Sequence, residues 1–161
     1  LGRRVFITAD PYSADLGGVA GADLACQEAA DAIGLLGQWQ AWISAFQNAV
    51  SDRFEPSDVP YVLLDGTLVA DDWGDLTDGL IQHAIDLDEH MVTTSTPRMV
   101  WTATMFSGAS LDSANCNDWS DDTEGSASVG TSFADITNGT WTIGGEVQCT
   151  AQDVHLYCFE K

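Results

Sequence analysis

The chain has 161 residues, a length that fits one domain, 1–161, with a sizeable hydrophobic core. It carries 25 Asp and Glu residues against 5 Lys and Arg residues, which gives a formal net charge of −20. This charge repels phosphate backbones, anionic lipids and heparin-like polyanions, so we expect no binding of nucleic acid or of such polyanions. No apolar run approaches the roughly 20 residues that span a bilayer, so we expect no membrane insertion.

The N-terminal third of the chain predicts a strand, a helix and a second strand. The segment 4–8 is apolar and typical of a strand. Over 19–33, small and apolar residues recur at helical spacing with acids on the opposite side, and Gly34 marks the end of this helix. The aromatic and β-branched segment 39–44 predicts the next strand.

The middle of the chain predicts a hairpin followed by an irregular acidic segment. Asp65-Gly66 separates two apolar runs within 61–70, which is typical of a hairpin with a type I′ turn. Residues 71–90 predict little regular structure beyond a helical turn around Trp73. Two further apolar segments predict strands, at 99–102 and 155–159.

A long segment, 104–148, is rich in Gly, Ser, Thr, Asn and Asp and shows little periodicity, so we expect a loop region with little core of its own. The four cysteines lack the close spacing of a zinc site and predict two disulfides in an oxidising compartment, with reduced buried thiols as the alternative. They are Cys26, Cys116, Cys149 and Cys158. Three pairings are possible. A bridge between Cys116 and Cys149 would pin the loop region covalently.

Carboxylates are concentrated after the hairpin, at Asp71, Asp72, Asp75, Asp78, Asp86, Asp88 and Glu89. Hard oxygen ligands in a short irregular stretch suit calcium, and if a structural calcium ion binds, we expect Asp86, Asp88 and Glu89 to hold it. A solvated acidic face is the preferred interpretation, because the whole chain is rich in acids and Met91 stands where an EF-hand loop needs glycine.

Acids also flank an aromatic residue in the loop region. Asp118, Asp121, Asp122 and Glu124 stand near Trp119. An aromatic ring flanked by acids can stack on a sugar or hold a cationic side chain, so we expect these five residues to bind a ligand. The alternative is that Trp119 lies in the core while the acids point to water. The other tryptophans are expected to be core or core-edge residues: Trp39, Trp42, Trp73, Trp101 and Trp141.

No motif indicates catalysis. His90 near Asp86, or His83 near Asp78, could form a general base and its orienting carboxylate. The sequence has neither a Gly-x-Ser-x-Gly motif nor a reactive cysteine with a histidine partner. Pairs of acids could serve glycoside hydrolysis, but such pairs arise here by composition alone. We therefore expect that the protein is not an enzyme.

A series of segments in the same order along the chain resembles endostatin-type domains. The motifs include Ala41-Trp42-Ile43-Ser44 and Cys116-Asn117-Asp118-Trp119. The segments are 17–44, 59–62, 73–79, 100–102, 116–119, Cys149 and 156–161. The chain is most similar to the leptospiral endostatin-like domain family, a bacterial family whose fold is a variant of the C-type lectin fold.

This resemblance implies an α+β, C-type-lectin-like domain with a mostly antiparallel sheet, one main helix and long disulfide-stapled loops. It implies the disulfides Cys26–Cys158 and Cys116–Cys149. It also implies an extracellular or cell-surface domain, since known members are adhesins for host matrix proteins and complement regulators. Leu1 in place of Met fits a domain excised from a longer secreted or surface precursor.

The chain departs from C-type lectins at their sugar-binding positions. The loop 102–115 lacks the Glu-Pro-Asn or Gln-Pro-Asp tripeptide, and Trp141-Thr142-Ile143 stands where Trp-Asn-Asp supplies calcium ligands. Endostatin's arginine-rich heparin surface and its N-terminal zinc-binding histidines are missing as well. We expect a binding module, an adhesin or recognition domain with an extracellular protein or glycan partner. The alternative is a carbohydrate-binding lectin domain, with or without calcium, and a third is an acidic glycan-degrading enzyme.

Overall fold

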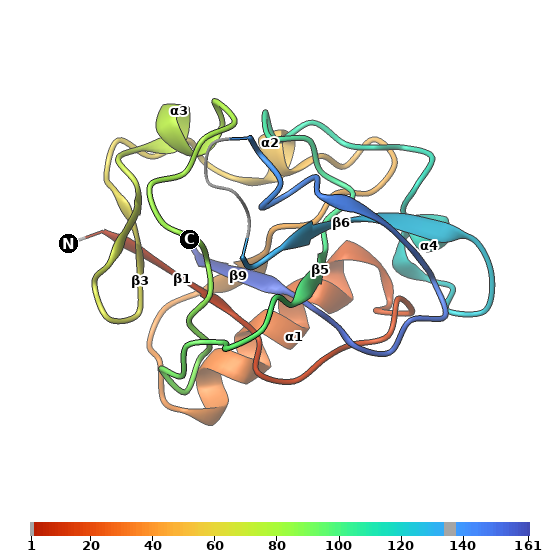
Figure 1. Ribbon diagram of the computed structural model, residues 1–161, viewed down its shortest axis with the longest axis horizontal. Helices are drawn as coiled ribbons and strands as arrows, with labels where there is room; N and C mark the ends of the chain where they lie inside the picture. The colour runs from red at the N-terminus through yellow and green to blue at the C-terminus, as the bar shows by residue number, and fades with distance from the viewer. Residues whose placement is uncertain (1, 134–137) are drawn as a thin grey trace.

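The computed structural model describes residues 2–133 and 138–161 and contains two β-sheets (Figure 1). The larger sheet has five strands in the order β2-β9-β1-β3-β4, and only β1 and β3 pair in parallel. Its strands are β1 (Arg3–Ile7), β2 (Trp39–Ala41), β3 (Tyr61–Leu63), β4 (Leu68–Ala70) and β9 (Tyr157–Glu160).

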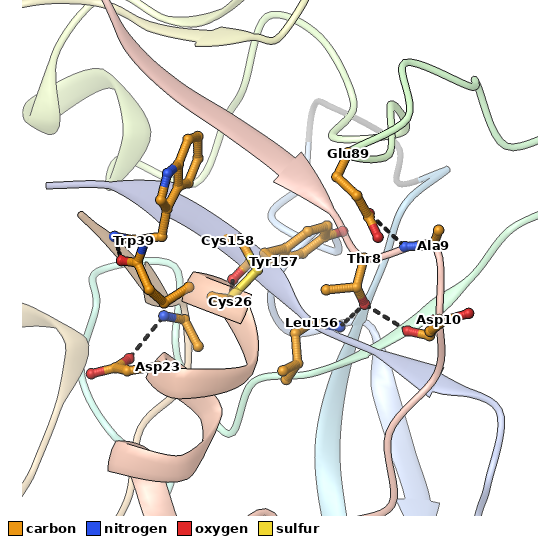
Figure 2. Close-up of a disulfide and its surroundings, with 12 residues drawn as sticks. Thr8, Ala9, Asp10, Asp23, Cys26, Trp39, Glu89, Leu156, Tyr157 and Cys158 are labelled. Carbon is orange, nitrogen blue, oxygen red and sulfur yellow. Dashed lines mark hydrogen bonds between the residues drawn. A yellow bond between two sulfur atoms is a disulfide. The ribbon is translucent and has the colours of Figure 1, made fainter. Parts of the chain in front are cut away.

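The helix α1 (Gly18–Ala32) covers one face of this sheet, and we call the sheet and this helix together the helix-covered sheet (Figure 1). Its apolar residues point to the same core as Phe6 of β1, because small residues recur at helical spacing. The disulfide Cys26–Cys158 joins α1 to β9 across this core (Figure 2). The predicted helix, 19–33, is confirmed to within one residue at each end.

Aromatic side chains cover the opposite face of the helix-covered sheet. The ring of Trp42 lies 4.8 Å from Trp141, 5.3 Å from Phe159 and 5.4 Å from Phe54, measured between centroids. The buried indole Nε1 of Trp42 donates a hydrogen bond to Thr142 Oγ1 at 2.7 Å, which satisfies its one polar group. Segments far apart in the sequence therefore meet in one aromatic core.

Two short helices lie in the connections. The helix α3 (Trp73–Leu76) is the predicted turn, and Asp72 caps it by accepting a hydrogen bond from the Asp75 backbone at 2.9 Å. The helix α2 (Val50–Arg53) is too short to leave a periodic signal in the sequence. Trp73 is half-buried, and the other tryptophans predicted for the core are buried: Trp39, Trp42, Trp101 and Trp141.

The smaller sheet has four strands in the order β7-β6-β5-β8, and only β5 and β8 pair in parallel. Its strands are β5 (Met99–Trp101), β6 (Ser126–Thr131), β7 (Gly145–Gln148) and β8 (Val154–His155). The strands β6 and β7 lie inside 104–148, so the prediction of an extended loop is wrong for them. Ser, Ala and Gly give these strands little β propensity, although their backbone pairing is regular.

The last predicted strand is divided in the structure into two strands, and these belong to different sheets. The segment 155–159 was expected to be a single strand, but β8 ends at His155 and β9 begins at Tyr157. The first pairs with β5 of the smaller sheet and the second with β1 and β2 of the larger one. The chain therefore passes directly from one sheet to the other at Leu156.

The predicted hairpin over 61–70 is present, but its turn differs. Leu63 donates a backbone hydrogen bond to Thr67 at 2.8 Å, and Gly66 donates one to Leu63 at 2.9 Å. Gly66 has φ of 91°, whereas Asp65 is not among the residues with positive φ. A type I′ turn needs positive φ at both central residues, so that prediction is wrong and the loop has three residues with a left-handed glycine at its end.

These features establish a mixed α+β fold with two disulfides. One parallel pair in each sheet accompanies otherwise antiparallel pairing. Within residues 2–133 and 138–161, no helix has the length and apolar character needed to cross a membrane.

Candidate binding surface

The segment 104–148, which we call the stapled loop region, contains an unusual turn. The element α4 (Cys116–Trp119) has four consecutive residues with φ of 52°, 55°, 56° and 64°, so it is one turn of left-handed helix. Figure 1 labels this element beside β6. For residues with a Cβ atom this conformation costs roughly 1–2 kcal/mol each, less for Asn and Asp. Interactions around the turn must offset that cost.

Three kinds of interaction hold the left-handed turn. The side chain of Asn115 accepts a hydrogen bond from the backbone of Asp118 at 3.1 Å and donates one to its carboxylate at 2.7 Å. The backbone of Trp119 donates to the Asn115 carbonyl at 2.9 Å. The disulfide Cys116–Cys149 then ties the turn to the end of β7. Both disulfides are the ones that the resemblance implies.

Trp119 does not lie on the surface, so the prediction that it stacks on a ligand is wrong. Its side chain is fully buried, and its indole Nε1 donates a hydrogen bond to the Ser44 carbonyl at 2.7 Å. Its ring meets Trp101 edge to face at 5.7 Å between centroids. The indole is therefore an anchor that holds the left-handed turn on the core, and burial of its large apolar area outweighs the pull of its acidic neighbours toward water.

Asp118 also has a structural task. Its carboxylate Oδ1 accepts hydrogen bonds from the backbone of Phe46 at 2.7 Å and from the Asn115 side chain at 2.7 Å. These bonds link the loop after β2 to the left-handed turn. A ligand would have to compete with these bonds for the Asp118 carboxylate. Asp118 therefore positions the loop and is not a free ligand contact.

A groove of about 410 Å³ lies beside the left-handed turn. Polar side chains and the backbone of the stapled loop region line it, including Ser113, Asn115, Asn117, Asp121, Glu124 and Ser126. Two of the five residues predicted to bind a ligand, Asp121 and Glu124, thus reach one shared hollow. Asp122 is half-buried and is not part of its lining.

The carboxylate of Asp121 is held in place as an anion. The backbone and the hydroxyl of Thr123 donate to Asp121 Oδ1 at 2.8 and 2.6 Å, and these hydrogen bonds lower the pKa of Asp121 below its ordinary value. Glu124 is exposed beside it. The groove therefore presents fixed negative charge.

Asn115 and Asn117, which the sequence analysis did not select, also line this groove. Their signal in the sequence is weak, because asparagine is common in loops and their placement depends on positive φ and on a distant cysteine. Only the spacing of Asn115 before Asp118 resembles a cap.

The residues predicted to hold calcium are engaged by the backbone. Asp88 Oδ1 accepts hydrogen bonds from the backbones of His90 at 3.0 Å and Val92 at 2.9 Å. Glu89 Oε2 accepts one from Ala9 at 2.7 Å (Figure 2). Asp88 and Glu89 are both buried.

Asp86 lies beside His83, with 3.8 Å between Oδ1 and Nδ1. Across residues 2–133 and 138–161, no three His, Cys, Asp or Glu side chains converge in a way that could hold a metal. Calcium at Asp86, Asp88 and Glu89 therefore stays a prediction. If the ion binds there, a chelator should lower the melting temperature, since an ion that binds the native state stabilises it.

The half-buried His83 and the exposed His90 have partners other than those that the sequence suggests. His83 lies near Asp86, and His90 Nε2 lies 3.9 Å from Glu89 Oε1. These pairs differ from His90 with Asp86 and His83 with Asp78, which the sequence suggests. Glu89 also accepts a hydrogen bond from the backbone of Ala9.

A scan against models of known protein families and a search of curated proteins found no match for this chain. The leptospiral endostatin-like family therefore stays a prediction.

Proposed function

We propose that this chain is an extracellular or cell-surface binding module, an adhesin or recognition domain that contacts a protein or glycan partner through the stapled loop region. The two disulfides are consistent with an oxidising, extracellular compartment. The proposal includes no catalytic step.

The groove beside the left-handed turn carries this proposal. Binding residues tend to lie on loops that a rigid scaffold positions. Here the loop is fixed at three points, by Cys116–Cys149, by the buried ring of Trp119 and by the bonds of Asp118. A fixed loop loses little conformational freedom on binding, which favours affinity.

The charge of the groove selects the chemistry of the partner. Asp121 and Glu124 face the hollow, and the chain as a whole has a net charge of −20. A cationic or neutral partner is favoured because a second polyanion would be repelled at long range. Such attraction weakens with salt, because the Debye length falls to about 3 Å near 1 M ionic strength.

The test combines a partner screen with a charge-matched pair of double variants. The screen uses immobilised extracellular-matrix proteins and a glycan array. For any partner found, Asp121→Asn with Glu124→Gln should weaken binding about tenfold or more at low salt, and added salt should weaken binding to the unmodified protein. The control, Glu28→Gln with Asp58→Asn, makes the same charge change at exposed residues outside the groove and should change affinity by less than about twofold.

Undiminished binding by the groove variant would move the site elsewhere, most simply to the acidic stretch after Asp71. Binding that strengthens with salt would point to an apolar contact and remove the electrostatic part of the proposal.

A lectin function is the second candidate, and the groove suits it because its amides, hydroxyls and carboxylates can pair with sugar hydroxyls. A glycan array probed with and without chelator separates it from protein recognition. Retained glycan binding in chelator would support a calcium-independent lectin.

A further inference from the structure

The few basic residues of this acidic chain are distributed unevenly. Of the 5 Lys and Arg residues, three line one cavity of about 300 Å³. The lining consists of Arg3, Gln38, Gln40, Arg53, Glu55 and Lys161. In Figure 1 the chain ends lie in the left half of the view and α4 lies toward the right, so this cavity is remote from the groove of the stapled loop region.

Strand geometry brings these side chains together. Side chains alternate between the faces of a sheet, so Arg3 shares a face with Val5, and Gln40 shares a face with its cross-strand partner Phe159. Continuing the pairing of Val5 with Phe159 by two residues places Arg3 opposite Lys161. Two cations directly opposite one another destabilise a sheet unless something lies between them.

Arg3 and Lys161 also differ from the other bases in their partners. Arg4 pairs with Glu160 at 2.6 Å, and Arg53 pairs with Asp23 at 2.6 Å. The fifth base, Arg98, lies 3.9 Å from a carboxylate oxygen of Asp88. Among residues 2–133 and 138–161, neither Arg3 nor Lys161 has an Asp or Glu carboxylate within 4.0 Å. Arg3 donates a hydrogen bond from Nη1 to the Glu55 carbonyl at 3.1 Å, and its guanidinium also lies beside the Tyr61 hydroxyl.

Gln40 supplies an independent observation. Its residue is 3% exposed and lines the cavity, and its polar atoms are not among the buried side-chain atoms that lack a hydrogen-bond partner. The carboxamide is therefore accessible from the cavity. A ligand in the cavity can use it as both a hydrogen-bond donor and an acceptor.

We propose that this cavity binds a small hydroxycarboxylate, such as a uronic acid, with its carboxylate between Arg3 and Lys161 and a hydroxyl group on Gln40. The planar guanidinium of Arg3 fits a carboxylate in bidentate fashion, and Gln40 can donate to or accept from a hydroxyl. Glu55 also lines the cavity, and its carboxylate can accept a hydrogen bond from a second hydroxyl group. This site is separate from the groove in the stapled loop region and does not rest on its function.

The size and charge of the ligand follow from the rest of the molecule. The net charge of −20 penalises each negative charge that approaches, so a monoanion is favoured over a phosphate dianion or a polyanion. A cavity of about 300 Å³ is at the lower end of the range for small-molecule sites. A long anionic polysaccharide would be repelled by the acidic surface beyond the cavity, so a small ligand is favoured.

The test is an NMR titration of the ¹⁵N-labelled chain with sodium glucuronate, glucose and sodium sulfate at constant ionic strength. Glucuronate should shift the side-chain amide signals of Gln40 saturably, and glucose should not. Arg3→Gln and Lys161→Gln should each weaken glucuronate binding about tenfold, since each removes a charge-assisted hydrogen bond.

Two further variants complete the design. Gln152→Glu makes the charge of the chain more negative by one, as Lys161→Gln does, at an exposed residue outside the cavity, and should leave the affinity within about twofold. Gln40→Met keeps the shape of the side chain and should weaken glucuronate binding, read from the backbone signals of the sheet. Equal binding of glucose, sulfate binding as tight as glucuronate, or unchanged affinity in both Arg3→Gln and Lys161→Gln would overturn the proposal.

Discussion

The helix-covered sheet and the stapled loop region reach a fixed structure by different means. In the sheet, the inner strands β9 and β1 are buried on both faces, with α1 on one side and an aromatic core on the other. In the loop region, four residues adopt a left-handed conformation that few side chains favour, and a disulfide, one indole and a few polar bonds hold it. Apolar periodicity builds the first, whereas individual contacts build the second.

The two disulfides illustrate this difference. Cys26–Cys158 joins a helix and a strand that already pack on each other, and the two cysteines are 132 residues apart. Cys116–Cys149 spans 33 residues and holds a turn that is otherwise unfavourable. The first bridge therefore adds global stability, and the second also determines a local conformation.

Removing the bridges should give the largest effects. In the chain-entropy model, Cys26→Ala with Cys158→Ala costs about 5 kcal/mol of unfolding free energy, and Cys116→Ala with Cys149→Ala costs about 4 kcal/mol. Guanidinium denaturation measures both. Hydrogen exchange of the folded variants should separate them, because loss of the second bridge should expose the Trp119 amide while Phe6 stays protected. If the Trp119 amide stayed as protected as the Phe6 amide in the variant without Cys116–Cys149, that bridge would not hold the left-handed turn.

Truncating the buried indole of the loop region should have the next largest effect. Trp119→Ala should lower the unfolding free energy by about 3–5 kcal/mol, because it leaves a cavity and an unpaired Ser44 carbonyl. Trp119→Phe, which keeps most of the apolar area, should cost clearly less. Trp39→Ala in the helix-covered sheet is the matched comparison, since Trp39 is also buried. A cost below about 1 kcal/mol for Trp119→Ala would contradict its role as an anchor.

The handedness of the turn can be tested by comparing the stabilities of Ala and Gly variants at two exposed residues. Asn117 has φ of 55°, so Asn117→Gly should be more stable than Asn117→Ala by about 1 kcal/mol. At Glu28, an exposed residue of the right-handed helix α1, the order should reverse, with Ala better than Gly by about 1 kcal/mol. Urea midpoints of the four variants measure both differences. Ala above Gly at both positions would rule out the left-handed turn.

The smallest effect is expected from pH, at the junction of the two sheets. Burial lowers the pKa of His155 from its ordinary value, and its ring Nδ1 lies 2.8 Å from the Thr8 carbonyl, to which the neutral ring donates. The unfolded chain therefore binds a proton more readily than the folded one, and stability falls as pH falls below about 6.5. Urea unfolding between pH 7.5 and 5.5 measures how steeply the unfolding free energy depends on pH, and His155→Gln should reduce this dependence. The same dependence in His155→Gln as in the unmodified protein would mean that other groups cause it.

The helix-covered sheet could be predicted because its signals are local. The spacing of Val19, Ala22 and Cys26 fixes the buried side of α1, and the apolar segments of β1 and β9 need no knowledge of their partners. The break at Leu156 could not be predicted, since only the two separate sheets show that β8 and β9 have different neighbours.

The stapled loop region could not be predicted to the same extent because its contacts are distant in sequence. The acidic neighbours of Trp119 favour a ligand-binding position, with a core position as the alternative, and the partner that decides between them is Ser44, 75 residues away. Gly130 lies where a Cβ would come within 1.9 Å of the Trp141 carbonyl, a close approach that no local pattern indicates. Asp121 and Glu124 were selected from composition, and only the fold shows that they share a groove.

The same disulfide that closes the helix-covered sheet also limits how far the domain can stretch. The strands β1 and β9 are antiparallel neighbours, so a pull between Arg3 and Lys161 would separate their pairs one at a time from a common end. Extension would stop at Cys26–Cys158, after release of only the residues outside the bridge. These residues supply roughly 90 Å, compared with roughly 500 Å for the unbridged chain. Under load the domain would act as a short tether, and the stapled loop region with its groove would lie within the bridged part of the chain, which carries no load.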